Sequence, residues 1–351
     1  MKVKTDELRA AFKIVDNVPV NLILESSQFL KIHQEGDKLT LSLTGALQAE
    51  ASISGQSQGG KWSAYVDRKV FRSFISTASD PEIELFYKDK LTMKSGQRLE
   101  LALHAAITGY ESWAPKSSFD LEDDQKSFIR MAVKYLPNIA GTENCEAIWF
   151  DKERIVVTDK IFMIELRGSA VKQSFILPPD VARFLASSPE KIAVDKIGVG
   201  AAISNGFIFQ PKSSYLDTYP IDSIKAILAE GAKAPTTIKF KADEFSSALK
   251  IALQFIPNKS DGVSIESKDK TVSMTVDTGS GKFQKSVKCT NGTGTLSGPI
   301  KIPSQKLVPW LEYAGSAELE YARIATSKLS NVSVFRFTDS TRKNSLIVAD
   351  L

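Results

Sequence analysis

The sequence predicts an α+β fold made of three tandem copies of one domain, each with two helices packed on antiparallel sheets. An amphipathic helical segment with an acidic beginning recurs three times. A second helical segment follows each of these after a short extended stretch, and the intervening chain alternates apolar and polar residues. At 351 residues the chain is also longer than one hydrophobic core ordinarily supports, so several domains are expected.

The first helical segment of each copy starts with acidic residues, which suit the positive end of a helix dipole. The three segments read DELRAAFKIV from Asp6, DDQKSFIRMAVKYL from Asp123 and ADEFSSALKIALQF from Ala242. In the first of them, apolar residues at intervals of three and four predict one buried helix face, formed by Leu8, Ala11, Phe12 and Val15. A recurring segment of this kind, at nearly constant spacing, indicates an internal repeat.

The second helical segment is preceded by an extended stretch and followed by an alternating one in every copy. These segments read WSAYVDRKVFRSFIS, QSFILPPDVARFLAS and GPIKIPSQKLVPWLEYAG, with Pro178, Pro179 and Pro303 at the expected helix starts. The stretches PEIELFYKD, EKIAVDKIG and AELEYARIA then predict strands, and DTGSGKFQ predicts a hairpin turn between strands. We place the domains at residues 1–116, 117–232 and 233–351, with linkers at WAPKSSFD and LAEGAKAPTT.

Composition excludes several classes of function. The two cysteines and two histidines are scattered, so we expect no metal site, no cofactor and no catalytic Cys-His or Ser-His-Asp group. No long apolar run predicts a membrane span or a signal peptide, and we expect a cytoplasmic protein. A hydrolase or nuclease remains an alternative, although the sequence contains no recognisable group of catalytic residues.

A cation recurs at one position of the repeat, because alignment of the first helices brings Lys13, Arg130 and Lys250 together. Any one of them is most simply a solvated surface charge, but the recurrence favours a shared basic wall that contacts phosphates without reading sequence. The net charge of +4 permits such contacts. The full set of cations expected to contact duplex DNA is Arg9, Lys13, Arg68, Lys69, Arg72, Lys126, Arg130, Lys134, Arg183, Lys250 and Lys306.

In the order of its segments the chain resembles the bacterial sliding clamp, the beta subunit of DNA polymerase III. In the first copy YVDRKVFRSFIS and PEIELFYKDKLTMKSGQRLELAL carry the resemblance, in the second RIVVTDKIFMIELRG and YLDTYPIDSIKAIL, and at the end NSLIVADL. The resemblance implies a ring of two head-to-tail copies around duplex DNA. By alignment the subunit interface would use Leu99, Leu101, Phe255 and Ile256, which are alternatively residues of the domain cores.

The family also binds short peptides of the polymerase and the clamp loader in an apolar pocket. Position by position, the resemblance implies that this pocket consists of Cys145, Thr158, Lys160, Phe162, Met163, Ile227, Ile347 and Val348. The sequence departs from the family pattern at Lys160-Ile161-Phe162 and in the tail that ends at Leu351. Such divergence would suit a clamp encoded by a phage or plasmid.

The sequence therefore predicts a processivity factor without catalytic activity, which encircles DNA in the bacterial cytoplasm or nucleoid and tethers a polymerase. The alternative is a monomeric adaptor or decoy that has the clamp fold and binds replication proteins without encircling DNA.

Overall fold

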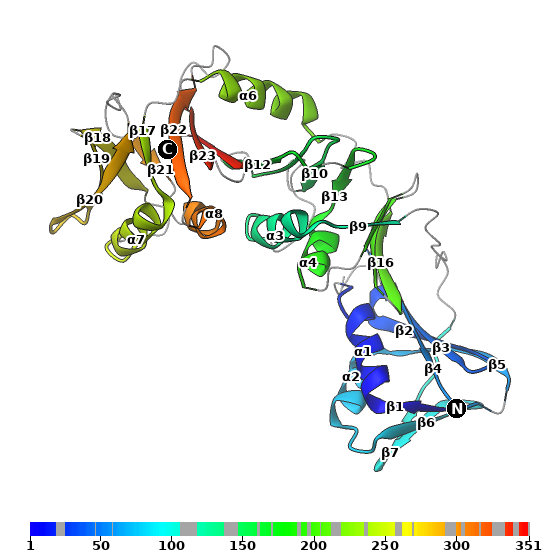
Figure 1. Cartoon of the computed structure of the whole chain (residues 1–351). Helices are drawn as coiled ribbons and strands as arrows, with labels where there is room; N and C mark the ends of the chain where they lie inside the picture. The colour runs from blue at the N-terminus through cyan, green and yellow to red at the C-terminus, as the bar shows by residue number, and fades with distance from the viewer. Residues whose placement is uncertain are drawn as a thin grey trace. The chain divides into compact units, whose positions relative to one another are not determined.

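The computed structural model describes residues 1–18, 25–45, 47–57, 59–105, 118–136, 147–159, 162–169, 171–187, 191–194, 198–203, 205–211, 219–234, 238–256, 262–268, 270–291, 300–302, 306–315, 317–324, 334–339 and 344–349. The chain forms two compact units (Figure 1). Unit 1 comprises Met1–Leu121 and Arg183–Lys212, and unit 2 comprises Glu122–Ala182 and Ser213–Leu351.

Among the described elements one order occurs three times: a strand, a helix, four strands, a second helix and three strands. The first passage is β1 (Lys2–Lys4), α1 (Thr5–Val15), β2 (Phe29–Glu35), β3 (Lys38–Thr44), β4 (Gln48–Ser54), β5 (Lys61–Asp67), α2 (Arg68–Thr77), β6 (Glu82–Tyr87), β7 (Leu91–Ser95) and β8 (Gln97–Leu101). The second is β9 (Ser118–Asp120), α3 (Asp123–Ala132), β10 (Ile148–Phe150), β11 (Arg154–Thr158), β12 (Phe162–Arg167), β13 (Phe175–Leu177), α4 (Pro179–Ser187), β14 (Lys191–Val194), β15 (Gly198–Ile203) and β16 (Gly206–Pro211). The third is β17 (Ile238–Lys241), α7 (Ala242–Leu253), β18 (Val263–Lys268), β19 (Thr271–Asp277), β20 (Lys282–Asn291), β21 (Ile300–Ile302), α8 (Leu307–Ala314), β22 (Glu318–Ile324), β23 (Val334–Asp339) and β24 (Asn344–Ala349). A 3-10 turn, η1 (Glu25–Gln28), and the helix α6 (Ile221–Lys233) stand outside this order.

Unit 1 contains two antiparallel sheets. The smaller sheet has the strand order β1-β6-β7-β8, and the larger has the order β5-β2-β3-β4-β16-β15-β14-β9. The middle of the larger sheet is a pairing of distant segments, because Gln48 to Ala51 of β4 lie opposite Phe209 to Gly206 of β16. The helices α1 and α2 contact each other, with Phe12 and Phe71 buried between them at a ring distance of 5.2 Å.

Unit 2 is built on one antiparallel sheet of twelve strands, in the order β13-β10-β11-β12-β24-β23-β22-β17-β20-β19-β18-β21. It too joins distant segments, since Phe162 to Leu166 of β12 pair with Val348 to Asn344 of β24. The helices α7, α8 and α3 follow one another along one side of this sheet, with α8 in contact with both neighbours, and α6 lies on the other side (Figure 1). We call α7, α8 and α3 the helix row.

The three predicted first helices are confirmed. Each begins with acidic residues in its first turn and carries one cation in its last turn, namely Lys13, Arg130 and Lys250. A positive charge near the C-terminus of a helix is favourable because the carbonyl ends of the helix dipole lie there. At the start of α3, Glu122 and Gln125 form a capping box, which satisfies backbone N–H groups that otherwise have no helical partner. The strands predicted after each second helix are confirmed as β6, β14 and β22.

Most of the predicted linker LAEGAKAPTT is helical, because α6 continues through it to Lys233. Glycine normally weakens a helix, but Gly231 is buried where a Cβ would lie 3.1 Å from Ile347 Cδ1 and 3.2 Å from Ile324 Cδ1. Close packing against the sheet therefore explains the glycine. Of the other predicted linker, WAPKSSFD, residues 113–117 lie outside the described residues.

The predicted hairpin turn at DTGSGKFQ is confirmed, with Gly279 in the left-handed region at φ +75° between β19 and β20. Cys289 has a free, half-buried thiol, and burial raises its pKa. Within the described ranges, no helix combines the length and apolarity that crossing a membrane requires, and no group of three or more His, Cys, Asp or Glu could hold a metal ion.

Candidate nucleic-acid interface and partner surface

The helix row of unit 2 is fixed by aromatic packing and by one buried phenol. Phe128 of α3 meets Tyr313 of α8 edge to face at a ring distance of 6.3 Å. Tyr135, just after α3, donates a hydrogen bond of 2.5 Å to the carbonyl of Lys306 and accepts one of 3.1 Å from the amide of Trp310. Burial raises the pKa of Tyr135, so the phenol stays neutral and can donate. These contacts hold the exposed side chains of the row at defined positions.

Three predicted cations of unit 2 lie exposed on this row. Lys250 of α7 and Lys134 after α3 both approach the carboxylate of Glu312 on α8, at 2.9 Å and 3.6 Å. Arg130 of α3 is exposed and has no acidic partner among the described residues. Nothing in the sequence marks Glu312, because its position beside two lysines depends on how α8 packs between α3 and α7.

Two other predicted cations of unit 2 are engaged by neighbouring acids. Lys126 is partly exposed and lies 3.4 Å from Asp123. Lys306, just before α8, pairs with Asp159, and its ammonium lies 5.7 Å from the centre of the Phe162 ring. Because Lys306 ties Asp159, which follows β11, to the start of α8, it is a weaker candidate for a phosphate contact than Arg130.

In unit 1 some of the predicted cations are unpaired among the described residues, and others bind neighbouring groups. Lys13 and Lys69 are exposed and have no acidic partner in the described part of the chain. Arg72 is exposed but binds Asp16 at 2.6 Å. Arg9 donates to the carbonyls of the last turn of α2 and the residue after it, at 2.9 Å and 2.6 Å, and so ties α1 to α2. Arg183, in α4, is only partly exposed.

The prediction that Arg68 contacts DNA is wrong. Its side chain is only 3% exposed and bonds to the Asp16 carboxylate at 2.9 Å. It also donates to the backbone carbonyls of Asp16, Val18 and Ser27. The Arg68 guanidinium thereby supplies hydrogen-bond donors to backbone carbonyls of the segment that follows α1. The sequence of a surface helix does not indicate such a role. The neighbouring Lys69 is exposed because successive helix residues point about 100° apart.

This pair of neighbours yields a direct test. We expect Arg68→Met to destabilise unit 1 by about 3 kcal/mol, since removal of one partner from a buried charged network leaves the others unsatisfied. We expect Lys69→Met to leave the free energy of unfolding nearly unchanged and to weaken DNA binding. Urea unfolding followed by circular dichroism measures the first effect. Equal stability of the two variants would show that the Arg68 network does not stabilise the fold.

The residues predicted for a peptide pocket lie on both faces of the sheet of unit 2. Met163 pairs with Thr158 on one side and with Ile347 on the other, so these three share the face toward α6. Phe162 pairs with Val348, and both point to the opposite face, where Phe162 meets Tyr135 at a ring distance of 6.2 Å. The prediction that all these residues line one pocket is therefore wrong, because adjacent residues of a strand alternate between faces.

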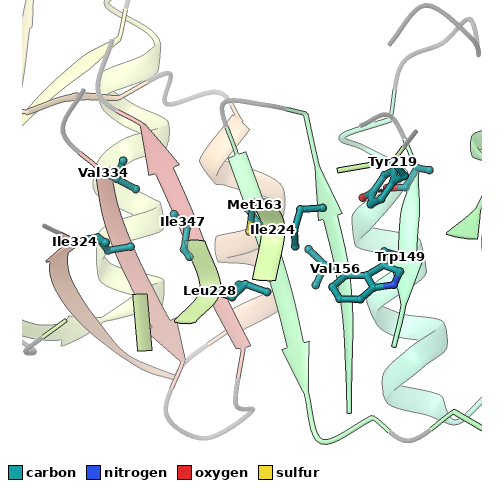
Figure 2. Packing of buried hydrophobic residues seen from close by; sticks show 10 residues of the cluster. Trp149, Val156, Met163, Tyr219, Ile224, Leu228, Ile324, Val334 and Ile347 are labelled. Atoms are coloured by element: carbon teal, nitrogen blue, oxygen red, sulfur yellow. Dashed lines mark hydrogen bonds between the residues drawn. The ribbon is translucent and has the colours of Figure 1, made fainter. Parts of the chain in front are cut away.

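The face toward α6 carries a buried apolar cluster. Figure 2 shows Ile224 and Leu228 of α6 beside Met163, Ile347 and Trp149 of the sheet. Met163 is 6% exposed and Ile347 is 5% exposed, so α6 covers most of both side chains. At the rim of this cluster stand half-buried apolar residues: Ile176, Ile221, Ile227 and Ala234. The remaining predicted pocket residues, Cys145 and Lys160, lie outside the described residues.

Polar contacts hold α6 in this place. Arg336 of β23, which is buried, donates hydrogen bonds to the carbonyls of Gly231 and Ala234 at the C-terminal end of α6. At the other end, the ammonium of Lys225 lies 5.4 Å from the centre of the Trp149 ring. The apolar spacing of Ile221, Ile224 and Leu228 is the signal by which the sequence could have indicated this helix.

Exposed apolar side chains occur in both units. The large hydrophobic residues that are exposed in the described part of the chain all belong to α2, β6 and α7 or its C-terminal end: Val70, Phe86, Tyr87, Ile251 and Phe255. Phe255 is 44% exposed and stacks on Phe283 of β20 at a ring distance of 4.4 Å. Of the other predicted interface residues, Ile256 and Leu99 are half-buried, whereas Leu101 is 3% exposed and belongs to the core.

No protein family model and no curated protein matches the sequence. Solved structures do match it over the whole chain. A DNA polymerase III subunit beta from Pseudomonas aeruginosa is similar with a TM-score of 0.82 and 13% identity, over 100% of this chain and 99% of that one. A putative DNA polymerase III beta subunit from Eubacterium rectale has a TM-score of 0.83 and 11% identity, over 100% and 98%.

A Helicobacter pylori beta clamp bound to a DNA ligase peptide is also similar, with a TM-score of 0.74 and 14% identity, over 100% of this chain and 98% of that one. At such identities the likeness concerns the fold. The resemblance noted from the order of the sequence segments is thus confirmed at the level of structure, and the chain has the fold of the DNA polymerase III beta sliding clamps.

Proposed function

We propose that the protein is a DNA polymerase processivity factor, a sliding clamp that surrounds duplex DNA and performs no chemistry itself. The observation that carries the proposal is the recurrence of an exposed cation in the last turn of α1, α3 and α7, within a chain that has the clamp fold throughout. Contacts from lysine and arginine to phosphates do not depend on base sequence, as sliding requires. The three passages of elements would be three clamp domains, at residues 1–116, 117–232 and 233–351.

The strand pairing supports closure of a ring by a second copy. In both junctions within the chain, the third strand after a first helix pairs with the last strand of the following passage: β4 with β16, and β12 with β24. By the same pattern, β20, the third strand after α7, would pair with β8, the last strand of the first passage. β8 ends its sheet, and β20 from Lys282 to Val287 pairs with β19 alone among the described strands. Antiparallel pairing of β20 with β8 of a second copy would complete a head-to-tail dimer.

Exposed apolar side chains lie on the helices that would meet in this dimer. In unit 2, α3 of one passage packs on α8 of the next, so α7 would pack on α2 of the second copy. The exposed Ile251 and Phe255 lie on or just after α7, and the exposed Val70 lies on α2. Exposed apolar residues gathered in this way are typical of an interface.

Partner proteins would bind at the rim of α6. The Helicobacter pylori neighbour holds a DNA ligase peptide, which supports peptide-mediated tethering of a polymerase and other replication proteins. Here the accessible apolar residues are Ile227, Ile221 and Ile176, with Met163 and Ile347 as the floor beneath α6. A short peptide with apolar side chains suits such a surface.

Retention on DNA of different topology tests the proposal. Protein loaded on nicked circular duplex should co-elute with the DNA in gel filtration and should be released once a restriction enzyme linearises it. Light scattering should give the mass of two chains. Equal retention on circular and linear DNA would show that the protein does not encircle DNA.

A second candidate function is that of a monomeric adaptor with the clamp fold. The observation that favours it is that Arg72, Lys134, Lys250 and Lys306 are each paired with an acid, which reduces the positive charge available to DNA. A monomer at high micromolar concentration that still binds partner peptides would support this alternative over the ring.

A further inference from the structure

We propose that Glu312 is an internal substitute for a DNA phosphate, which holds Lys134 and Lys250 and weakens their grip on the backbone so that the protein slides. This inference rests on the proposed function, because it requires the helix row to face DNA. It assigns a role to a carboxylate that lies between two lysines of the helix row.

In this cluster one carboxylate faces two lysine ammonium groups, as a phosphate group could. Each carboxylate oxygen of Glu312 takes one lysine: Oε1 lies 2.9 Å from Lys250 Nζ and Oε2 lies 3.6 Å from Lys134 Nζ. The two lysines come from opposite neighbours of α8, so the carboxylate bridges the whole helix row. The hydrogen bond from Lys250 is the main cause that lowers the pKa of Glu312, which keeps the carboxylate ionised at neutral pH.

The cluster is open to competition from DNA. The side chains of Glu312, Lys134 and Lys250 are between 45% and 52% exposed. An ion pair at such exposure contributes little net stability, because water screens it and both side chains lose freedom. A phosphate can therefore take over either lysine at small cost. The carboxylate that is then left beside the phosphate repels it, and this repulsion shortens the contact.

A related pairing occurs in unit 1, where Asp16, which follows α1, binds the buried Arg68 and also the exposed Arg72 of α2, the latter at 2.6 Å. Lys13, Lys69 and Arg130 lack such a counter-charge among the described residues. Within its described ranges, each unit thus carries free cations as well as cations that are already paired. Free cations attract the duplex, and paired ones exchange partners as the phosphates move past.

Removal of the carboxylate is expected to strengthen DNA binding. Each phosphate contact adds about 0.9 to the slope of log K against log salt concentration. In full-length Glu312→Gln, Lys134 and Lys250 can contact phosphates unopposed. We therefore expect binding to a labelled 30-base-pair duplex to tighten about tenfold or more at 0.1 M salt, and the slope to steepen by roughly 1 to 2. Diffusion along DNA should slow correspondingly.

Two controls isolate the effect. Glu266→Gln removes an exposed carboxylate from β18, with the same change in net charge, and should alter affinity less than about twofold. In a background of Lys134→Gln and Lys250→Gln, the change Glu312→Gln should have no more effect than Glu266→Gln, which a purely structural role of Glu312 would not predict. Equal thermal unfolding of all variants confirms that the fold is intact.

The outcomes separate the inference from the proposed function. If the wild-type protein binds DNA and Glu312→Gln gains no more affinity than Glu266→Gln, the role of Glu312 is refuted and the clamp function stands. If neither the wild-type protein nor Glu312→Gln binds duplex DNA at low salt, the proposed function fails and this inference fails with it. A gain that persists in the background without the two lysines would also overturn the inference.

Discussion

Simultaneous replacement of Lys13, Arg130 and Lys250 by glutamate should weaken binding to duplex DNA by two orders of magnitude or more at 0.1 M salt. Each phosphate contact contributes about eightfold at this salt concentration through counterion release, and three lost contacts multiply to several hundredfold. All three residues are exposed in the last turns of α1, α3 and α7. Their replacement should therefore leave the free energy of unfolding within about 0.5 kcal/mol per site.

The measurement is the retention of the protein by a labelled 30-base-pair duplex, given as a dissociation constant at several salt concentrations. A matched control replaces Lys38, Lys152 and Lys172, which are equally exposed but lie outside the helices, by glutamate. The control has the same net charge and should keep most of its retention. Unchanged retention of the helix variant at low salt would show that these helices do not face DNA.

Phe255→Ala should break the proposed ring of two copies. A buried aromatic anchor at an interface typically contributes 2 kcal/mol or more, which corresponds to about 30-fold in the dissociation constant. A ring of two copies contains two such interfaces, so the loss of binding free energy applies at each of them. Because the side chain is 44% exposed in the single chain and stacks only on Phe283 among the described aromatic rings, its truncation should cost the isolated fold little.

Light scattering over a range of concentrations gives the dissociation constant, and the variant should also leave circular DNA faster. Ile227→Ala, which removes a half-buried apolar side chain from α6, serves as the control and should leave the dimer intact. A dimer of unchanged affinity in Phe255→Ala would place the subunit interface elsewhere.

The local pattern of the sequence was sufficient for the repeated helices and for the strands that follow them, but not for α6. Acidic starts and apolar intervals of three and four located α1, α3 and α7, and period-two alternation located β6, β14 and β22. These signals are local, because helix dipoles and strand pleats act over a few residues. The alignment of Lys13, Arg130 and Lys250 follows from them, and the structure places each in the same turn of its helix.

The candidate site needed more than local pattern. The position-by-position resemblance predicted that Phe162 and Met163 line one pocket. In the structure they are adjacent residues of β12, and their side chains point to opposite faces of the sheet. Gly231 was interpreted as a linker residue because glycine is a poor helix former, whereas close contact with Ile347 and Ile324 explains it within α6. The alternation along β12 is local and the sequence could have indicated it, whereas the partners of Gly231 are distant in sequence.

The sequence by itself determined the α+β repeat, the order of its helices and strands, and the recurrence of a cation on each first helix. Only the tertiary structure decided which charges are available. Arg68 is buried against the chain after α1, Lys69 beside it is free, and Glu312 occupies two of the lysines of the helix row. The physical reason is that secondary structure depends on neighbours along the chain, whereas burial and ion pairing depend on neighbours in space, which packing alone brings together.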